Sequence, residues 1–150
     1  STSFTNKIML LNFHFKSINS IDIYESTILS GGSDGFVKAL DVNVFKDSAN
    51  NKTLKKNQHN LLINKKMYMQ NNNKANEISK VKALNKELCV IGDIYGMINV
   101  VNYINGKPIT SSLASIETIK EIYNFNSNLL VIDRMSSNYI YSLNSNLKSP

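Results

Sequence analysis

The chain has 150 residues, of which 42% are hydrophobic, so it is long and apolar enough to fold as one packed domain. It contains a single cysteine, Cys89, which excludes an internal disulfide, and no apolar run approaches the roughly 18 residues that a transmembrane helix requires. The N-terminus also lacks the charged and then apolar pattern of a secretion signal. We therefore expect an intracellular, cytoplasmic protein with no membrane partner.

One pattern of apolar residues occurs three times along the chain, and a tight turn and a further apolar strand follow each copy. The copies are Ile18-x-x-Ile21-x-Ile23-Tyr24-x-x-x-Ile28-Leu29, Ile78-x-x-Val81-x-Ala83-Leu84-x-x-x-Leu88-Cys89 and Ile119-x-x-Ile122-x-Asn124-Phe125-x-x-x-Leu129-Leu130. These runs are short, β-branched and interrupted by turn residues, which indicates strands rather than helices. The repeat predicts an all-β fold, a β-propeller whose blades are four-stranded antiparallel sheets.

The first blade is expected at about residues 14–70. An outer closing strand at 7–13 precedes it, its inner strands occupy 17–44, and its own outer strand lies at about 61–69. Residues 46–60 are polar and rich in Lys and Asn, which predicts a mobile, low-complexity insertion between the third and fourth strands of this blade.

The second blade is expected at about 74–114, with residues 107–112 as its outer strand, and the third at about 115–146 with three strands only. Propellers generally need about four to eight blades, so three do not close a ring. We therefore expect the chain to be part of a larger propeller, or one of two copies that close a ring together.

The turn between the second and third strands of each copy contains residues that suit a bend. We expect these bends at Asp34–Gly35, Tyr95–Gly96 and Ser137–Asn138. With the bends placed there, the strands that follow align Val37 with Ile98 and Ile140.

The first copy also carries polar residues at a recognisable spacing. His14 lies four residues before Ile18, and the turn Ser30-Gly31-Gly32-Ser33-Asp34-Gly35 leads to Leu40-Asp41. Here the chain resembles the WD40-repeat family, whose repeats open on Gly-His, pass through a Ser-Gly-Ser-x-Asp-Gly turn and close on Trp-Asp. The resemblance implies a structural hydrogen-bond network of His14, Ser30 and Asp34, without the family's tryptophan.

The resemblance is weaker in the other two copies. Lys74 and Ser115 stand at the histidine position, and Tyr95 and Ser137 stand at the aspartate position. The network is therefore expected in the first blade, and only the strand pattern is expected in the others.

The sequence offers no clear constellation for catalysis. Its two histidines and one cysteine have no zinc-binding spacing, and Cys89 lies among apolar residues, as a buried structural cysteine would. We expect no catalytic residue, no metal site, no cofactor and no enzyme activity. An enzyme with its site in the central channel is the weakest alternative.

The leading interpretation is a non-catalytic, WD40-like protein–protein interaction scaffold whose partners are other proteins. We expect the loops that carry His14, Asp34, Tyr95 and Met135 to dock a partner, with Tyr95 and Met135 as contact residues because both residue types are favoured at interfaces.

The alternative is an RNA- or ribonucleoprotein-associated propeller that uses its Lys-rich loops. The candidate residues are Lys52, Lys55, Lys56, Lys65 and Lys66. A net charge of +6 favours nucleic acid, but Arg134 is the only arginine among 17 basic residues, and phosphate-binding surfaces generally use arginine as well. Nucleic acid is therefore the less favoured partner.

Overall fold

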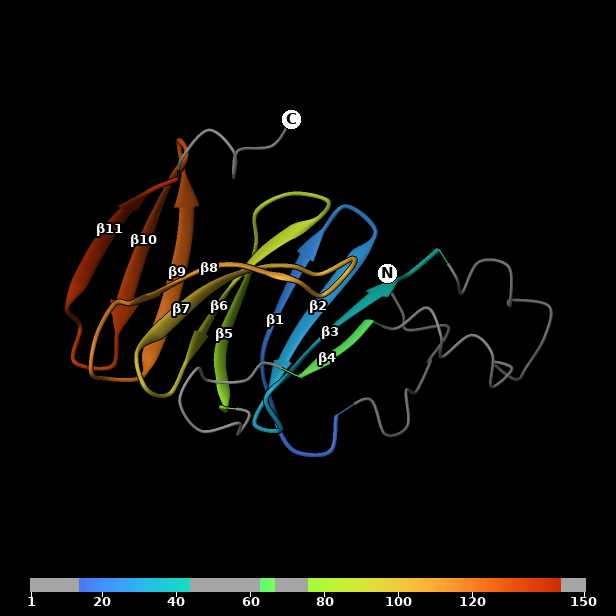
Figure 1. Cartoon of the computed structure of the whole chain (residues 1–150), viewed down its shortest axis with the longest axis horizontal. Coiled ribbons are helices and arrows are strands. Elements are labelled where there is room, and N and C mark those ends of the chain that lie inside the picture. The colour runs from blue at the N-terminus through green and yellow to red at the C-terminus, as the bar shows by residue number, and fades with distance from the viewer. Residues whose placement is uncertain (1–13, 44–62, 67–75, 144–150) are drawn as a thin grey trace, which may run out of the picture.

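The computed structural model describes residues 14–43, 63–66 and 76–143, which form eleven strands and no helix (Figure 1). The prediction of an all-β fold is thus confirmed for this part of the chain. The strand expected at 7–13 and the insertion expected at 46–60 lie outside the described residues. Because the described segments contain no helix, none is present there that could cross a bilayer.

The strands form three antiparallel sheets, in each of which neighbours in sequence are neighbours in space. The first sheet contains β1 (Ile18–Tyr24), β2 (Thr27–Gly32), β3 (Phe36–Asp41) and β4 (Ile63–Lys66). The second contains β5 (Ile78–Ala83), β6 (Leu88–Asp93), β7 (Met97–Asn102) and β8 (Pro108–Leu113), and the third contains β9 (Ile119–Phe125), β10 (Asn128–Asp133) and β11 (Asn138–Ser142). The strand content therefore follows the sequence repeat, and β8 begins one residue later than expected.

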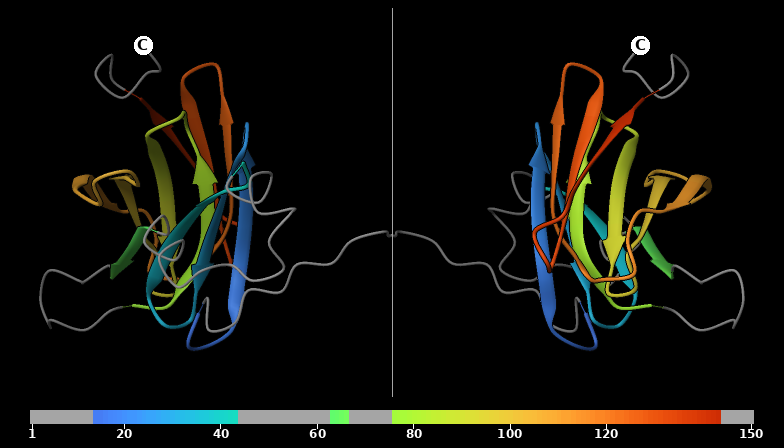
Figure 2. Two further views of the ribbon diagram at one scale, coloured as in Figure 1. Left: turned by 90° about the vertical axis from the view of Figure 1, so that its right-hand side faces the viewer. Right: turned by 90° about the vertical axis from the view of Figure 1, so that its left-hand side faces the viewer.

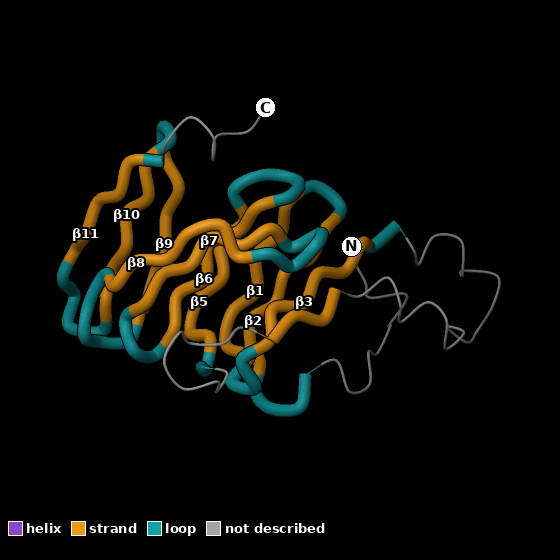
Figure 3. Tube along the Cα trace, viewed as in Figure 1, coloured by secondary structure: helices purple, strands orange, loops and turns teal. Residues whose placement is uncertain are grey.

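The three sheets follow one another in chain order, with β5 beside both β1 and β9. In the left panel of Figure 2 the first sheet faces the viewer, and in the right panel the third sheet does. The trace in Figure 3 consists of strands joined by loops throughout the described part.

Two hydrophobic clusters hold the sheets together. The first lies between the first and second sheets and includes Leu29 and Val37 from one side and Cys89 and Ile91 from the other. The second lies between the second and third sheets and includes Val90. Successive residues of a strand point to opposite faces, so β6 supplies both clusters in alternation and all six of its residues are buried. The second sheet is thus covered on both faces, which explains its continuous apolar pattern.

Glycine allows the sheets to approach closely at one repeated position. A Cβ atom on Gly31 would lie 2.5 Å from Cγ2 of Ile78, and a Cβ atom on Gly92 would lie 2.5 Å from Cγ2 of Ile119. Each of these isoleucines begins the sheet that follows. The strand register places Ile132, rather than a glycine, at the same position of the third sheet.

The strand register corrects the predicted bend of the third copy. Asn138 pairs with Ile132 as Val37 pairs with Gly31, which places the bend at Met135–Ser136 rather than at Ser137–Asn138. Ser136 has a positive φ of 66°, as Gly35 and Gly96 have at 79° and 84°. The predicted alignment was therefore wrong by two residues in β11, since Ile140 corresponds to Ala39 and Val100. A slip of two residues leaves every side chain on the same face, so apolar alternation could not detect it.

Candidate functional site

The structure brings the three polar residues singled out in the first copy together. Nδ1 of His14 donates to the Asp34 carboxylate, with 3.0 Å to each oxygen, and Nε2 of His14 lies 2.8 Å from Oγ of Ser30. The side chains of His14 and Asp34 are only 1% and 4% exposed. The backbone N–H groups of Phe15 and Phe36 also donate to Asp34. The carboxylate thus ties the loop that enters β1 to the turn that follows β2.

The pKa of Asp34 reflects two opposing effects. Burial raises it, but the hydrogen bond from His14 and those from the N–H groups of Phe36 and Phe15 outweigh burial and hold the pKa below the ordinary value of 3.8. The carboxylate therefore stays ionised in the folded protein near neutral pH.

The connectivity of Ser30, His14 and Asp34 is that of a serine hydrolase triad. A nucleophile must reach a substrate, however, and Ser30 is only 1% exposed within β2. Ser30 is also absent from the lining of the surface hollow described below. The geometry suits a network that satisfies buried polar groups and links two loops.

The second copy holds a carboxylate in the same way, but with Asp93. Its Oδ1 accepts the N–H groups of Tyr95 and Met97 at 2.8 and 3.0 Å, and its Oδ2 accepts Nδ2 of Asn76 at 2.9 Å. The sequence alignment had placed Tyr95 at the aspartate position and Lys74 at the histidine position, and no network was expected in this copy. Lys74 lies outside the described residues, and Asn76 supplies the donor.

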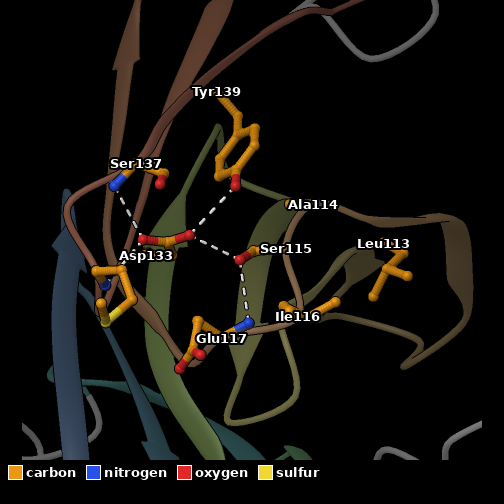
Figure 4. Close-up of a pocket in the computed structure, with 9 residues that line it drawn as sticks. Leu113, Ala114, Ser115, Ile116, Glu117, Asp133, Ser137 and Tyr139 are labelled. Carbon is orange, nitrogen blue, oxygen red and sulfur yellow. Dashed lines mark hydrogen bonds between the residues drawn. The ribbon is translucent and has the colours of Figure 1, made fainter.

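The third copy uses Asp133, which is 2% exposed. Its Oδ1 accepts the N–H groups of Met135 and Ser137, each at 2.9 Å, and its Oδ2 accepts the hydroxyls of Ser115 at 2.7 Å and Tyr139 at 3.2 Å (Figure 4). The Ser115 hydrogen bond is the main cause of a lowered Asp133 pKa, against the opposing effect of burial, and the other three donors act in the same direction. Ser115 had been placed at the histidine position, where it does bind a carboxylate.

These three carboxylates reach equivalent places from different positions in the sequence. Asp93 and Asp133 end their strands opposite Ile78 and Ile119, whereas the residue opposite Ile18 is Gly32. A Cβ on Gly32 would lie 2.6 Å from Nδ1 of His14 and 2.8 Å from Oδ1 of Asp34. Gly32 therefore leaves room for the carboxylate that Asp34 extends back from the turn.

Asp93 and Asp133 were not predicted from the sequence, because the carboxylate was expected at the turn position of Asp34. A usable signal was present, since an aspartate follows the apolar run of the second strand in both later copies, directly in the third copy and after Gly92 in the second. The pairing register shows that Tyr95 shares the position of Asp34, and that Met135, rather than Ser137, shares it in the third copy.

The β6–β7 and β10–β11 turns lie along the lower edge of the molecule in Figure 1. Tyr95, Ile116 and Met135 are 55%, 87% and 71% exposed. The carbonyl of Gly96 accepts the N–H groups of Ala114 and Ser115, and the carbonyl of Thr118 accepts the N–H of Arg134. The β6–β7 and β10–β11 turns therefore flank segment 114–118. We call the surface formed by the β6–β7 turn, segment 114–118 and the β10–β11 turn the turn face.

A hollow of about 480 Å³ opens on the turn face between segment 114–118 and the β10–β11 turn (Figure 4). Its lining is Leu113, Ala114, Ser115, Ile116, Glu117, Asp133, Met135, Ser137 and Tyr139. This volume lies within the range of about 300 to 1,000 Å³ that is usual for ligand sites. Of the predicted contact residues, Met135 lines the hollow and Tyr95 lies on the neighbouring turn.

The remaining sequence candidates have other positions. Cys89 is fully buried, and burial, followed by the charge of Asp22, raises the pKa of its thiol to about 12, so the reactive thiolate is disfavoured. Within the described ranges no three His, Cys, Asp or Glu side chains converge as metal ligands. Lys52, Lys55 and Lys56 lie outside the described residues, so RNA binding by the Lys-rich loops stays a prediction.

Comparisons with known proteins name no family for this chain. No protein-family model and no curated protein matches it. Among solved structures, it is similar to the computationally designed Ika4 protein with a TM-score of 0.44 and 10% sequence identity, over 94% of this chain and 100% of that one.

Proposed function

We propose that this chain is a non-catalytic, WD40-like segment of a β-propeller that serves as a protein–protein interaction scaffold, and that it docks its partner on the turn face. The fold part of the proposal is supported by three antiparallel meanders in series and by the repeated contact between Gly31 or Gly92 and the next sheet's isoleucine. The buried link of His14, Ser30 and Asp34 agrees with the resemblance of the first copy to that family.

One observation carries the docking part of the proposal. Tyr95, Ile116 and Met135 come from three separate loops and are all more than half exposed on one end of the molecule. Exposed apolar side chains cost free energy unless a partner covers them, and Tyr and Met are enriched at protein interfaces. The backbone that presents them is held firmly, because Asp93 and Asp133 bind the N–H groups of both turns.

Site-specific photo-crosslinking in the native cell tests the docking site. A photoreactive residue at Met135 or Tyr95 is expected to capture a defined partner, whereas the same residue at the exposed Asn105, on the β7–β8 turn, is not. The purified partner is then titrated against the wild-type chain, Met135→Glu and Asn105→Glu.

Met135→Glu places a charge among apolar side chains that the partner would cover, so this variant should bind the partner at least about tenfold more weakly, since even one buried apolar side chain contributes about 1.5 to 3 kcal/mol. Asn105→Glu should bind as the wild type does. Equal capture from Asn105, or equal affinity of all three proteins, would refute docking on the turn face.

A further inference from the structure

The hollow on the turn face has apolar walls and a polar floor. Leu113, Ile116 and Met135 are 61%, 87% and 71% exposed, so their side chains are accessible to a ligand. The carboxylate of Asp133 accepts four hydrogen bonds from the protein itself. Asp133 therefore holds the floor in place, and the apolar walls are the surface that a ligand would cover.

The first repeat fills the corresponding place with its own side chains. Phe36 and Ser137 are equivalent, because each directly precedes the first residue of its strand that pairs with the preceding strand, and each donates its N–H to Oδ1 of the local carboxylate. Phe15 and Ile116 are equivalent because each lies three residues before the isoleucine that begins the sheet. In the first repeat the rings of Phe15 and Phe36 meet edge to face, with centroids 5.9 Å apart.

The third repeat has no large side chain to match Phe36. The second repeat has Met97 at this position, and the third has Ser137. The strands and the turn keep their register, so the smaller side chain leaves space rather than drawing the backbone inward. The hollow is thus the place that an aromatic ring occupies in the first repeat.

A cation accompanies the aromatic pair of the first repeat. Nζ of Lys38 lies 5.4 Å from the centroids of both Phe15 and Phe36. The third repeat has Tyr139 at the position of Lys38. Its hollow is bordered instead by Glu117, whose carboxylate forms no ion pair with any described residue. An incoming cation would find a partner there.

We propose that this hollow is a docking pocket for an aromatic side chain flanked by Lys or Arg in a segment of a partner protein. This inference rests on the proposed scaffold function, for which it names the chemistry of the partner. The partner supplies the ring and the cation that the first repeat provides internally, and the apolar walls of Ile116 and Met135 cover the ring.

Capped tripeptides test the pocket by NMR titration of the ¹⁵N-labelled chain. The probes are acetyl-Lys-Phe-Lys-amide, acetyl-Lys-Ala-Lys-amide and acetyl-Glu-Phe-Glu-amide. The first probe should shift the amide signals of Ser115, Glu117 and Ser137, and it should bind at least about tenfold more tightly than the alanine probe, because only phenylalanine buries a large apolar surface. Equal binding of the phenylalanine and alanine probes would refute the pocket.

Two matched pairs of variants locate the site. Ser137→Phe restores the side chain of the first repeat and should abolish binding of the Lys-Phe-Lys probe, whereas Ser142→Phe, which adds the same ring to the other face of β11, should bind as the wild type does. Lys-Phe-Lys should bind more tightly than Glu-Phe-Glu, because Glu117 attracts the cations. Glu117→Gln should remove this preference, and Glu87→Gln, an exposed change in the β5–β6 turn, should preserve it.

Folding of Ser137→Phe is checked by its melting temperature and amide spectrum. If that variant does not fold, Ile116→Ser serves in its place, because Ile116 is 87% exposed and its replacement removes one apolar wall without adding a charge. Unchanged binding by a folded Ser137→Phe or by Ile116→Ser would overturn the pocket.

The two proposals fail separately. A crosslinked partner that loses affinity with Met135→Glu but not with Ser137→Phe would leave the scaffold standing and refute the pocket. Peptide binding that is lost in Ser137→Phe, without any partner captured through Met135, would support the pocket and refute the scaffold.

Discussion

The first and third repeats place a carboxylate between the same two loops, but they reach it by different routes. In the first, Asp34 extends back from the turn over Gly32, and in the third, Asp133 occupies the strand end itself. The donors differ as well, since His14 serves one and Ser115 and Tyr139 serve the other. The repeats share the location of the carboxylate in the fold, whereas the residue that supplies it differs by two positions in the aligned sequences.

The largest effect is expected from the turn glycine of the second repeat. Gly96 has a φ of 84°, and a Cβ on it would lie 2.0 Å from the backbone oxygen of Ser115. Gly96→Ala should destabilise the fold by about 3 kcal/mol or more, because the strain of a positive φ adds to a collision with backbone. Denaturant unfolding measures this.

Gly106→Ala is the control for the Gly96 variant. Gly106 also has a positive φ, at 71°, in the turn between β7 and β8. Its substitution should cost about 1 to 2 kcal/mol from backbone strain. If both variants lose the same free energy of unfolding, the collision of the added Cβ with the Ser115 carbonyl does not contribute to the loss in Gly96→Ala.

Removal of the first carboxylate should have the next largest effect. Asp34→Ala leaves the buried His14 Nδ1 and two backbone N–H groups without an acceptor, so we expect a loss of about 1 to 3 kcal/mol. Asp41→Ala removes an exposed carboxylate that, among the described residues, accepts only the nearby N–H of Asn43, and it should be nearly neutral. Equal melting temperatures for the two variants would show that the network does not stabilise the fold.

Acid should lower the stability that Asp34 in the first repeat and Asp133 in the third contribute to the fold. The pKa values of Asp34 and Asp133 lie below the ordinary 3.8, so the folded state binds fewer protons than the unfolded state. This stabilisation is complete above the unfolded value and is lost as the pH falls through the folded pKa values. Unfolding curves from pH 6 downwards should show stability falling below about pH 4, and less steeply in Asp34→Asn and Asp133→Asn. The same slope in all three proteins would contradict these assignments.

The smallest effect should come from Ser136, which holds the positive φ that glycine supplies in the other two turns. Ser136→Gly relieves the strain of a side chain at φ 66° but adds backbone freedom to the unfolded chain, so we expect a gain of less than about 1 kcal/mol. Thermal unfolding resolves a difference of this size in a small domain. A clear loss of stability would show that the Ser136 side chain has a role of its own.

The sequence predicted the strands better than it predicted the buried carboxylates that bind the turns. Short, β-branched apolar runs that begin at Ile18, Ile78 and Ile119 and are interrupted by turn residues were sufficient to place the strands. A pairing error of two residues leaves each side chain on the same face of the sheet, so this pattern could not reveal the error in β11. Asp93 and Asp133 were missed for a related reason, since a carboxylate that moves along the chain leaves no fixed spacing.

The hollow could not be predicted from the sequence at all. It depends on the absence of a ring at Ser137, and this absence has meaning only when the register aligns Ser137 with Phe36. The sequence did supply Met135 and Tyr95 as exposed turn residues, and Met135 lines the hollow.

The most direct test moves the carboxylate of the third repeat from position 133 to position 135, the position equivalent to Asp34. It asks whether stability depends on where the carboxylate lies in the fold rather than on which residue supplies it. The unfolding free energies of Asp133→Gly, Met135→Asp and the double variant are compared in a double-mutant cycle. We expect each single variant to be destabilised, the first by loss of the charge and the second by two competing carboxylates, and the double variant to be more stable than Asp133→Gly. A double variant that is no more stable than Asp133→Gly would contradict the account.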